Sequence, residues 1–204
     1  MGNREAREVL RAFIAADLTP AVREAVAQVS RNLQQKLAGL PLRWVAPENM
    51  HLTLKFLGDV SARNLRLLEE MLAGEARQHT AFEFGVGTLG AFPNPRHPRV
   101  LWVGVSGPDA LQRLHAGIEN AMARLGYPRE QRPYQPHLTL ARVARNAPAA
   151  VIRQISQVLR QETVGYLGSV RVEAIHLYRS DLSPQGPRYT RLFTAALATD
   201  RAAL

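Results

Sequence analysis

The chain has 204 residues, of which 46% are hydrophobic and 21% charged, and it contains no cysteine. This composition supports one compact unit or two small lobes and excludes an intrinsically disordered protein. The lack of cysteine excludes a disulfide scaffold and any cysteine-ligated zinc or iron–sulfur site. No apolar run approaches the roughly 20 residues that span a bilayer. The N-terminal segment lacks the apolar stretch of a signal peptide, so we expect a soluble cytoplasmic protein without membrane contact.

The formal net charge is +9, from 26 basic and 17 acidic residues. Only Lys36 and Lys55 are lysines, so the other 24 basic residues are arginines. Arginine keeps its charge and holds phosphate with a planar fork, which favours a polyanionic partner such as nucleic acid. A genomic or thermal preference for arginine is an alternative explanation that composition leaves open.

Hydrophobic periodicity predicts helices and strands in alternation along the chain. The apolar run at 11–16 predicts a strand. Thr19, followed by a proline, is a typical N-cap and predicts a helix that ends near Leu37. Residues 51–56 alternate as a strand that Gly58 ends. Further along, the same patterns predict a helix capped by Ser61, helices at 111–125 and 151–159, and strands at 82–86, 100–105, 137–141, 170–178 and 189–195.

One tetrapeptide, His-Leu-Thr-Leu, occurs at His51 and again at His137, 86 residues later. A single H-x-T-x match is weak, but two leucine-filled copies at strand starts indicate a duplication. We therefore predict an α+β fold that is bilobal and pseudo-twofold, with two antiparallel sheets facing a central cleft and helices on the outer faces. No linker or low-complexity segment divides the chain, so residues 1–204 are expected to form a single domain of two interleaved, pseudo-symmetric lobes.

Strand alternation determines which motif side chains share a face. It places His51, Thr53 and Lys55 on one face of the first strand, and Phe56 with the two leucines on the other. The second motif separates its histidine and threonine from its leucines in the same way. If the leucines face the helices, the histidines and threonines face the cleft.

Two imidazoles suit the displacement of one phosphate oxygen by another, because one can accept a proton while the other donates one. His51 and His137 are therefore the candidate catalytic residues. The Thr53 and Thr139 hydroxyls can donate to phosphoryl oxygens, and Arg142 can add a charged fork. Arg142 has the wrong parity for the cleft unless its strand bulges or ends just before it.

Two alternatives apply to the paired histidines. A metal site is one, but each motif supplies one histidine and no carboxylate on its strand, whereas catalytic zinc commonly has three protein ligands. We therefore predict no metal and no cofactor. The other alternative is that both histidines are strand-start residues that only bond to nearby backbone. The aromatic residues Phe13 and Tyr134 are candidates for stacking on a base, with core packing as the alternative.

The sequence resembles the two-histidine (2H) phosphoesterase superfamily, and within it the RNA 2',3'-cyclic phosphodiesterases, formerly called 2'-5' RNA ligases. The likeness rests on the two motifs and covers nearly the whole chain. It is carried by Arg-Ala-Phe-Ile-Ala at 11–15, Trp-Val-Ala-Pro-Glu-Asn-Met-His-Leu-Thr-Leu-Lys-Phe-Leu-Gly at 44–58, Pro-His-Leu-Thr-Leu-Ala-Arg at 136–142 and Leu-Ser-Pro-Gln-Gly-Pro-Arg-Tyr at 182–189.

The resemblance implies a bilobal α+β fold and metal-independent opening of a 2',3'-cyclic phosphate at an RNA end, leaving a 2'-phosphate. It implies that His51 is the proton donor and His137 the acceptor, with Thr53, Thr139 and Arg142 binding the phosphate. It also implies a reverse reaction that joins ends through a 2'-5' linkage.

Two other functions stay open at this stage. The protein could act on another cyclic phosphate, such as a small nucleotide, or on linear 2'-5' oligonucleotides. Alternatively, it could bind RNA ends without catalysis, with histidines that only hold phosphate. The expected partner is RNA with a 2',3'-cyclic phosphate end or a related cyclic nucleotide. We expect a monomer with no obligate protein partner.

Overall fold

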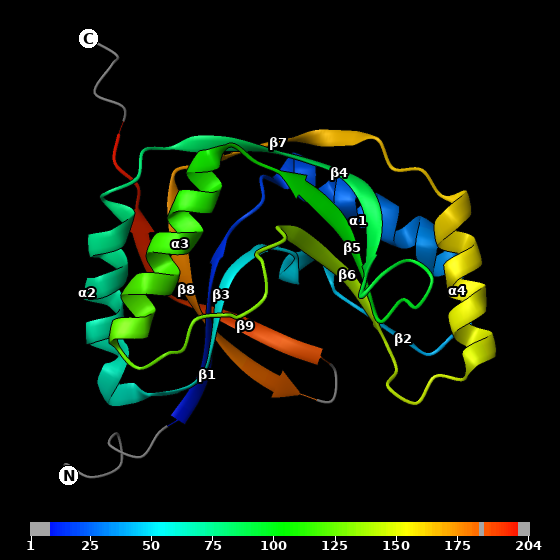
Figure 1. Cartoon of the computed structure of the whole chain (residues 1–204), viewed down its shortest axis with the longest axis horizontal. Helices are drawn as coiled ribbons and strands as arrows, with labels where there is room; N and C mark the ends of the chain where they lie inside the picture. The colour runs from blue at the N-terminus through cyan, green and yellow to red at the C-terminus, as the bar shows by residue number, and fades with distance from the viewer. Residues whose placement is uncertain (1–8, 184–185, 200–204) are drawn as a thin grey trace.

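The computed structural model describes residues 9–183 and 186–199, in which two antiparallel sheets form the framework (Figure 1). The first sheet has the order β3-β1-β8-β9, formed by Leu52–Ser61, Val9–Ala16, Ala174–Ser183 and Gly186–Ala196. The second has the order β2-β6-β5-β4-β7, formed by Leu42–Trp44, His137–Val143, Val100–Ser106, Phe82–Phe92 and Tyr166–Val172. The predicted α+β fold with two antiparallel sheets is confirmed.

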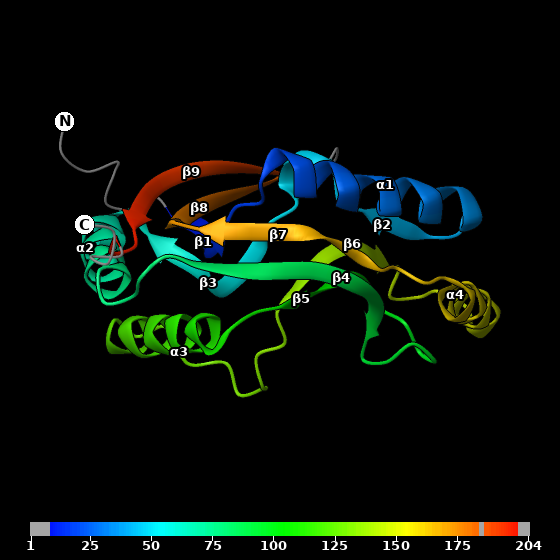
Figure 2. The ribbon, with the colours of Figure 1, turned by 90° about the horizontal axis from the view of Figure 1, so that it is seen from above.

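Four helices cover these sheets (Figures 1 and 2). Helix α2 (Leu65–Ala76) packs beside α3 (Asp109–Arg124) at one end of the molecule, where α2 contacts β9 and α3 contacts β3. Helix α1 (Pro20–Lys36) packs on β7, and α4 (Ala149–Gln161) lies at the opposite end (Figure 1). Thus α1 follows a strand of the first sheet but covers the second, whereas α3 follows a strand of the second sheet but covers the first. Both halves of the sequence contribute strands to both sheets.

The start of α1 follows directly from its sequence. Thr19 is the N-cap, and its side-chain oxygen accepts a hydrogen bond from the Val22 N–H at 3.4 Å. Proline fits the first helical position because it has no N–H to leave unpaired. The helix then buries one apolar stripe, which includes Val26 and Leu33. This predicted helix and its cap are confirmed.

Two predicted signals around the first motif strand are wrong. Gly58 does not end the strand, because it takes a φ of +71° within β3, pairs with Ala12 and lets pairing continue to Ser61. Ser61 does not cap α2, because its side chain makes no capping hydrogen bond and a short 3₁₀ turn (Ala62–Asn64) precedes the helix.

The predicted strand at 170–178 is in fact two strands in different sheets. Strand β7 ends at Val172 in the second sheet, and β8 begins at Ala174 in the first, so the chain crosses between sheets at Glu173. The short edge strand β2 (Leu42–Trp44) was not predicted, because three residues are too few to show the alternation that indicates a strand.

Both motif strands carry a β-bulge at the same place. In the pairing of β3 with β1, Ile14 lies opposite Lys55 and Ala15 opposite Thr53, which leaves Leu54 without a partner. In the pairing of β6 with β5, Leu101 lies opposite Ala141 and Trp102 opposite Thr139, which leaves Leu140 without a partner. Each extra residue is the third after its histidine. The faces therefore switch after both motifs.

The switch reverses two predicted orientations. Lys55, expected beside His51 and Thr53, is buried on the helix side of the sheet. Phe56, expected in the core with the leucines, is 67% exposed. Arg142 would lie opposite His137 in a regular strand, but the bulge at Leu140 places it on the same face as His137.

Burial of Lys55 is balanced by hydrogen bonds to two acceptors. Its Nζ lies 2.8 Å from a carboxylate oxygen of Glu119 on α3 and 2.8 Å from the Pro128 carbonyl oxygen. The same Glu119 oxygen accepts the backbone N–H of Glu130 at 3.0 Å. A buried ion is tolerated where such partners satisfy it. The pair therefore fastens α3 and the segment that leads toward the second motif to the first motif strand.

Replacing Lys55 with methionine leaves the buried Glu119 carboxylate without its lysine partner, so we expect the free energy of unfolding to fall by about 3–5 kcal/mol. Urea unfolding followed by circular dichroism measures this. The other lysine gives the matched control: Lys36 pairs with Glu162 while half exposed, so Lys36→Met should change stability by less than about 1 kcal/mol. Equal losses in the two variants would contradict the role assigned to the buried pair.

Candidate active site

His51 lies at the start of β3 among aromatic rings of the first sheet. Its ring stacks on Phe13, with centroids 4.7 Å apart and an interplanar angle of 21°, and meets Tyr189 edge-on at 5.3 Å. Burial lowers the pKa of His51 from 6.5 to about 4. A backbone hydrogen bond with Asn49 and the nearby Asp17 carboxylate act in the opposite direction. Without bound substrate, His51 is therefore neutral at pH 7.

Phe13 holds this histidine in place and is not free to stack on a base. Its side chain is 2% exposed, and its ring also contacts Tyr178 at 5.3 Å and Tyr189 at 4.9 Å. The prediction that Phe13 stacks on a base is therefore corrected, because side chains from β3, β8 and β9 already cover its ring. Phe13 is a core residue, which was the alternative given for it.

His137 lies at the start of β6 and is oriented by its own chain. Its Nδ1 is 2.7 Å from the Gln135 carbonyl oxygen. A carbonyl only accepts, so Nδ1 carries the proton and the other ring nitrogen, Nε2, is an acceptor in the neutral ring. Burial lowers the pKa of His137 from 6.5, and the positive charge of Arg142 adds to this effect. The two histidines share one further feature: each has its backbone hydrogen bond to the residue two positions earlier.

The two motifs meet where the sheets meet. Strand β3 of the first sheet contacts β6 of the second. Tyr134, just before the second motif, donates its hydroxyl to the Thr53 carbonyl oxygen at 3.1 Å. Arg142 is close enough to influence the pKa values of both His137 and Tyr189, and Tyr189 in turn contacts His51. Thr53 and Thr139 are both partly exposed on their strands. These contacts link the two motif strands and bring Arg142 near both His137 and Tyr189.

An open cavity of about 530 Å³ begins at His137 and extends over β5 and β4. Its lining includes the rings of Phe92, Trp102 and Tyr134, and Phe92 meets the His137 ring edge-on at 4.8 Å. A Cβ at Gly90 would lie 2.1 Å from the Trp102 ring, so this glycine is what allows the indole to lie flat on the sheet. The cavity therefore has an aromatic floor beside one motif histidine, while one face of Tyr134 is covered by His115 at 3.8 Å.

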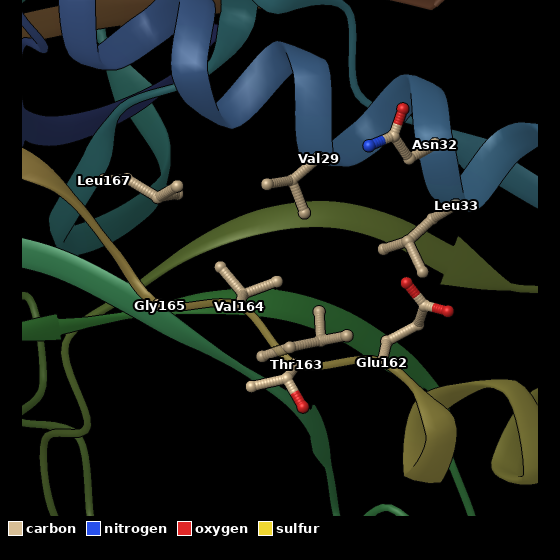
Figure 3. A pocket seen from close by; sticks show the side chains of 9 residues that line it. Val29, Asn32, Leu33, Glu162, Thr163, Val164, Gly165 and Leu167 are labelled. Carbon is tan, nitrogen blue, oxygen red and sulfur yellow. The ribbon is translucent and has the colours of Figure 1, made fainter.

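A second, smaller cavity of about 180 Å³ lies elsewhere (Figure 3). Figure 3 shows Val29 and Leu33 of α1 opposite Val164, in the segment that leads into β7. Neither motif contributes to its lining. The cavity beside His137 is therefore the candidate for the reacting group.

The pattern of the family described as "LigT like Phosphoesterase" matches the chain twice, over residues 17–102 and 103–189. The chain belongs to this family. The two matches begin at 17 and 103, with the same separation as the two motif histidines, which confirms the predicted duplication.

Two relatives of this LigT-like phosphoesterase bear the name RNA 2',3'-cyclic phosphodiesterase. The protein from Methanothermobacter thermautotrophicus is 37% identical over 185 residues, which cover 89% of this chain and 95% of that protein. The protein from Aeropyrum pernix is 38% identical over 164 residues, covering 79% of this chain and 89% of that protein. The predicted resemblance to this enzyme family is confirmed.

Solved structures are similar over nearly the full chain. A protein from Thermus thermophilus aligns with a TM-score of 0.77 at 28% identity, covering 94% of this chain and 100% of that one. Escherichia coli LigT, crystallised with 3'-AMP, aligns with a TM-score of 0.73 at 32% identity, covering 93% and 99%.

Sequence reasoning missed a polar cluster behind His51. The Asp17 carboxylate accepts the Tyr178 hydroxyl at 2.7 Å and pairs with Arg191. His176, buried beside them, bonds Thr194 through Nδ1 at 3.0 Å. Tyr178 also stacks on Phe13, and Phe13 stacks on His51, so the cluster helps to fix the position of the His51 ring. Tyr189, which contacts His51, was also not predicted as a site residue. It lies in the 182–189 segment that carries the family resemblance, and that resemblance could have indicated it.

Among residues 9–183 and 186–199, no group of three or more acidic or histidine side chains is arranged to hold a metal ion. In the same residues, no helix is long and apolar enough to cross a membrane.

The Arg142 charge opposes protonation of His137, so Arg142→Gln should raise the pKa of His137 toward 6.5. A titration of the imidazole resonances by NMR measures this directly. Arg113→Gln removes the same charge from the exposed face of α3 and should leave the His137 titration unchanged. A His137 pKa that stays constant in the Arg142 variant would show that the guanidinium does not act on this ring.

Proposed function

We propose that this protein hydrolyses RNA 2',3'-cyclic phosphate ends to 2'-phosphates, with His51 and His137 as acid and base. The observation that carries the proposal is the contact between two identically bulged His-Leu-Thr-Leu strands, one from each sheet. The names of the M. thermautotrophicus and A. pernix relatives support this substrate. We further propose that the whole chain works as one domain, to which each lobe supplies one histidine.

In this reaction, the neutral Nε2 of His137 accepts a proton from a water molecule whose oxygen attacks phosphorus. The bond from phosphorus to the ribose 3' oxygen breaks, and His51 donates a proton to that oxygen. The products are a 2'-phosphate and a free 3'-hydroxyl. His137 is left protonated and His51 neutral, and exchange with solvent restores both. The Gln135 carbonyl keeps the proton on Nδ1 of His137, so that Nε2 is available to accept.

His51 is neutral in the free protein, and the negative charge of the bound phosphate favours its protonation. A bound anion favours the imidazolium and raises the pKa of His51 from its low value. The Thr53 and Thr139 hydroxyls and the Arg142 guanidinium stabilise the charge that builds on the phosphoryl oxygens. Tyr134, which lines the cavity, stacks on the terminal base.

These roles need only protons and hydrogen bonds, so the proposed reaction is metal-independent. With the 5'-hydroxyl of another RNA in place of the attacking water, the same groups join the cyclic phosphate end to that hydroxyl as a 2'-5' linkage: His137 accepts the hydroxyl proton, and the 3' oxygen leaves with a proton from His51. We propose this ligation as a side activity.

The first test is hydrolysis of a short RNA ending in a 2',3'-cyclic phosphate, with excess EDTA, by the wild type and by the His51→Ala and His137→Ala variants. We expect the wild type to release a 2'-phosphate. Each variant should lose about 10²–10⁴-fold in kcat, because each removes a proton-transfer group. Circular dichroism checks that both variants fold.

Other outcomes would select other functions. Activity that EDTA abolishes would overturn metal independence. Binding of the RNA end without turnover would favour a non-catalytic binder. Turnover only of cyclic nucleotides or of 2'-5' oligonucleotides would move the substrate away from RNA ends.

The pH dependence of kcat/KM gives an independent check. This parameter reports pKa values of the free enzyme, where burial lowers those of both His51 and His137 below 6.5. Activity requires one histidine protonated and one neutral. As pH rises through the lowered pKa values, the acid loses its proton, so kcat/KM should peak below pH 6.5 and fall above it. The kcat profile should peak at higher pH, because bound phosphate favours the imidazolium. A kcat/KM optimum above pH 7 would contradict the lowered pKa values.

A further inference from the structure

Two arginines lie directly opposite each other on the edge of the second sheet. The antiparallel register of β2 and β6 pairs Arg43 with Arg142. Directly opposite residues of such a pair lie on the same face with neighbouring Cβ atoms. The flanking pairs, Leu42 with Val143 and Trp44 with Ala141, take the other face. Both guanidinium groups therefore project from the face that carries His137.

Nothing in the described part of the chain neutralises this pair. Neither Arg43 nor Arg142 makes an ion pair or a side-chain hydrogen bond within residues 9–183 and 186–199. Both are exposed. Like charges directly opposite on neighbouring strands destabilise a sheet. An anion between or beside the two side chains removes that repulsion.

The position of the pair indicates which anion fits. Arg142 is the member nearer the reacting centre, since its charge acts on His137 and Tyr189. Arg43 is one strand farther out, on the edge of the sheet, and on the side of β6 away from the cavity over β5 and β4. A terminal nucleoside in that cavity would carry its cyclic phosphate at the histidines, and the preceding phosphodiester is one ribose away on the same nucleotide.

We propose that Arg43 binds the phosphodiester immediately 5' to the cyclic phosphate while Arg142 binds the cyclic phosphate itself. This inference rests on the proposed function and narrows its substrate to RNA ends of at least two nucleotides. Arginine suits both positions because its planar fork meets phosphate oxygens with two hydrogen bonds. A nucleoside 2',3'-cyclic phosphate lacks the second phosphate and gains nothing from Arg43.

The test compares kcat/KM for adenosine 2',3'-cyclic phosphate and for the dinucleotide ApA that ends in the same cyclic phosphate. The wild type should prefer the dinucleotide. Arg43→Gln should lower kcat/KM for the dinucleotide about tenfold, the loss expected for one charged phosphate contact, and leave the mononucleotide within about twofold. Arg43→Lys should recover part of the loss, because a point charge replaces the fork. Arg113→Gln, with the same charge change on the outer face of α3, should match the wild type on both substrates.

Salt gives a second readout that a purely structural role would not change. Loss of one phosphate contact should reduce the slope of log kcat/KM against log salt by about 0.7 for the dinucleotide only. An equal loss on both substrates, or no loss on either, overturns the inference while the proposed function stands. If the wild type hydrolyses neither substrate, the proposed function itself fails.

Discussion

The active-site architecture depends on one extra residue at the same position in each motif strand. In a regular strand, the fifth residue after a histidine lies on the opposite face. The bulges at Leu54 and Leu140 exchange the faces of the residues that follow. In the first lobe the exchange buries Lys55, which fastens α3 and the approach to the second motif. In the second it brings Arg142 to the face of His137. The same bulge therefore places a buried ion pair, Lys55 with Glu119, in the first lobe and an exposed arginine, Arg142, in the second.

The two histidines have the same sequence context but different electrostatic surroundings. His51 is packed among aromatic rings with the Asp17 carboxylate nearby, whereas His137 borders an open cavity beside a guanidinium. A carboxylate favours an imidazolium and a guanidinium disfavours it. In the proposed reaction Asp17 and the bound phosphate favour the imidazolium of His51, whereas burial and the Arg23 charge keep this ring neutral until the phosphate binds. The fold is nearly symmetric, but the charges around its centre are not.

Local patterns predicted most of this molecule, because local physics determines them. The Thr19 cap, the amphipathic helices and the start of both motif strands depend on neighbours in sequence. The crossing at Glu173 could not be predicted, because it depends on pairing partners that are distant in sequence: β7 pairs with β4, whereas β8 pairs with β1 and β9. The burial of Phe13 depends on Tyr178 and Tyr189 from the far end of the chain. The pairing of Arg43 with Arg142 likewise required the register between β2 and β6.

The crossing at Glu173 also bears on how a duplicated chain of this kind can exist. The first sheet needs β8 and β9 from the end of the chain, and the second needs β2 and β4 from its first half. One repeat alone would expose unpaired sheet edges and half of each helix layer. The repeat in this sequence is therefore not a segment that could fold stably on its own, because each sheet takes strands from both halves of the chain.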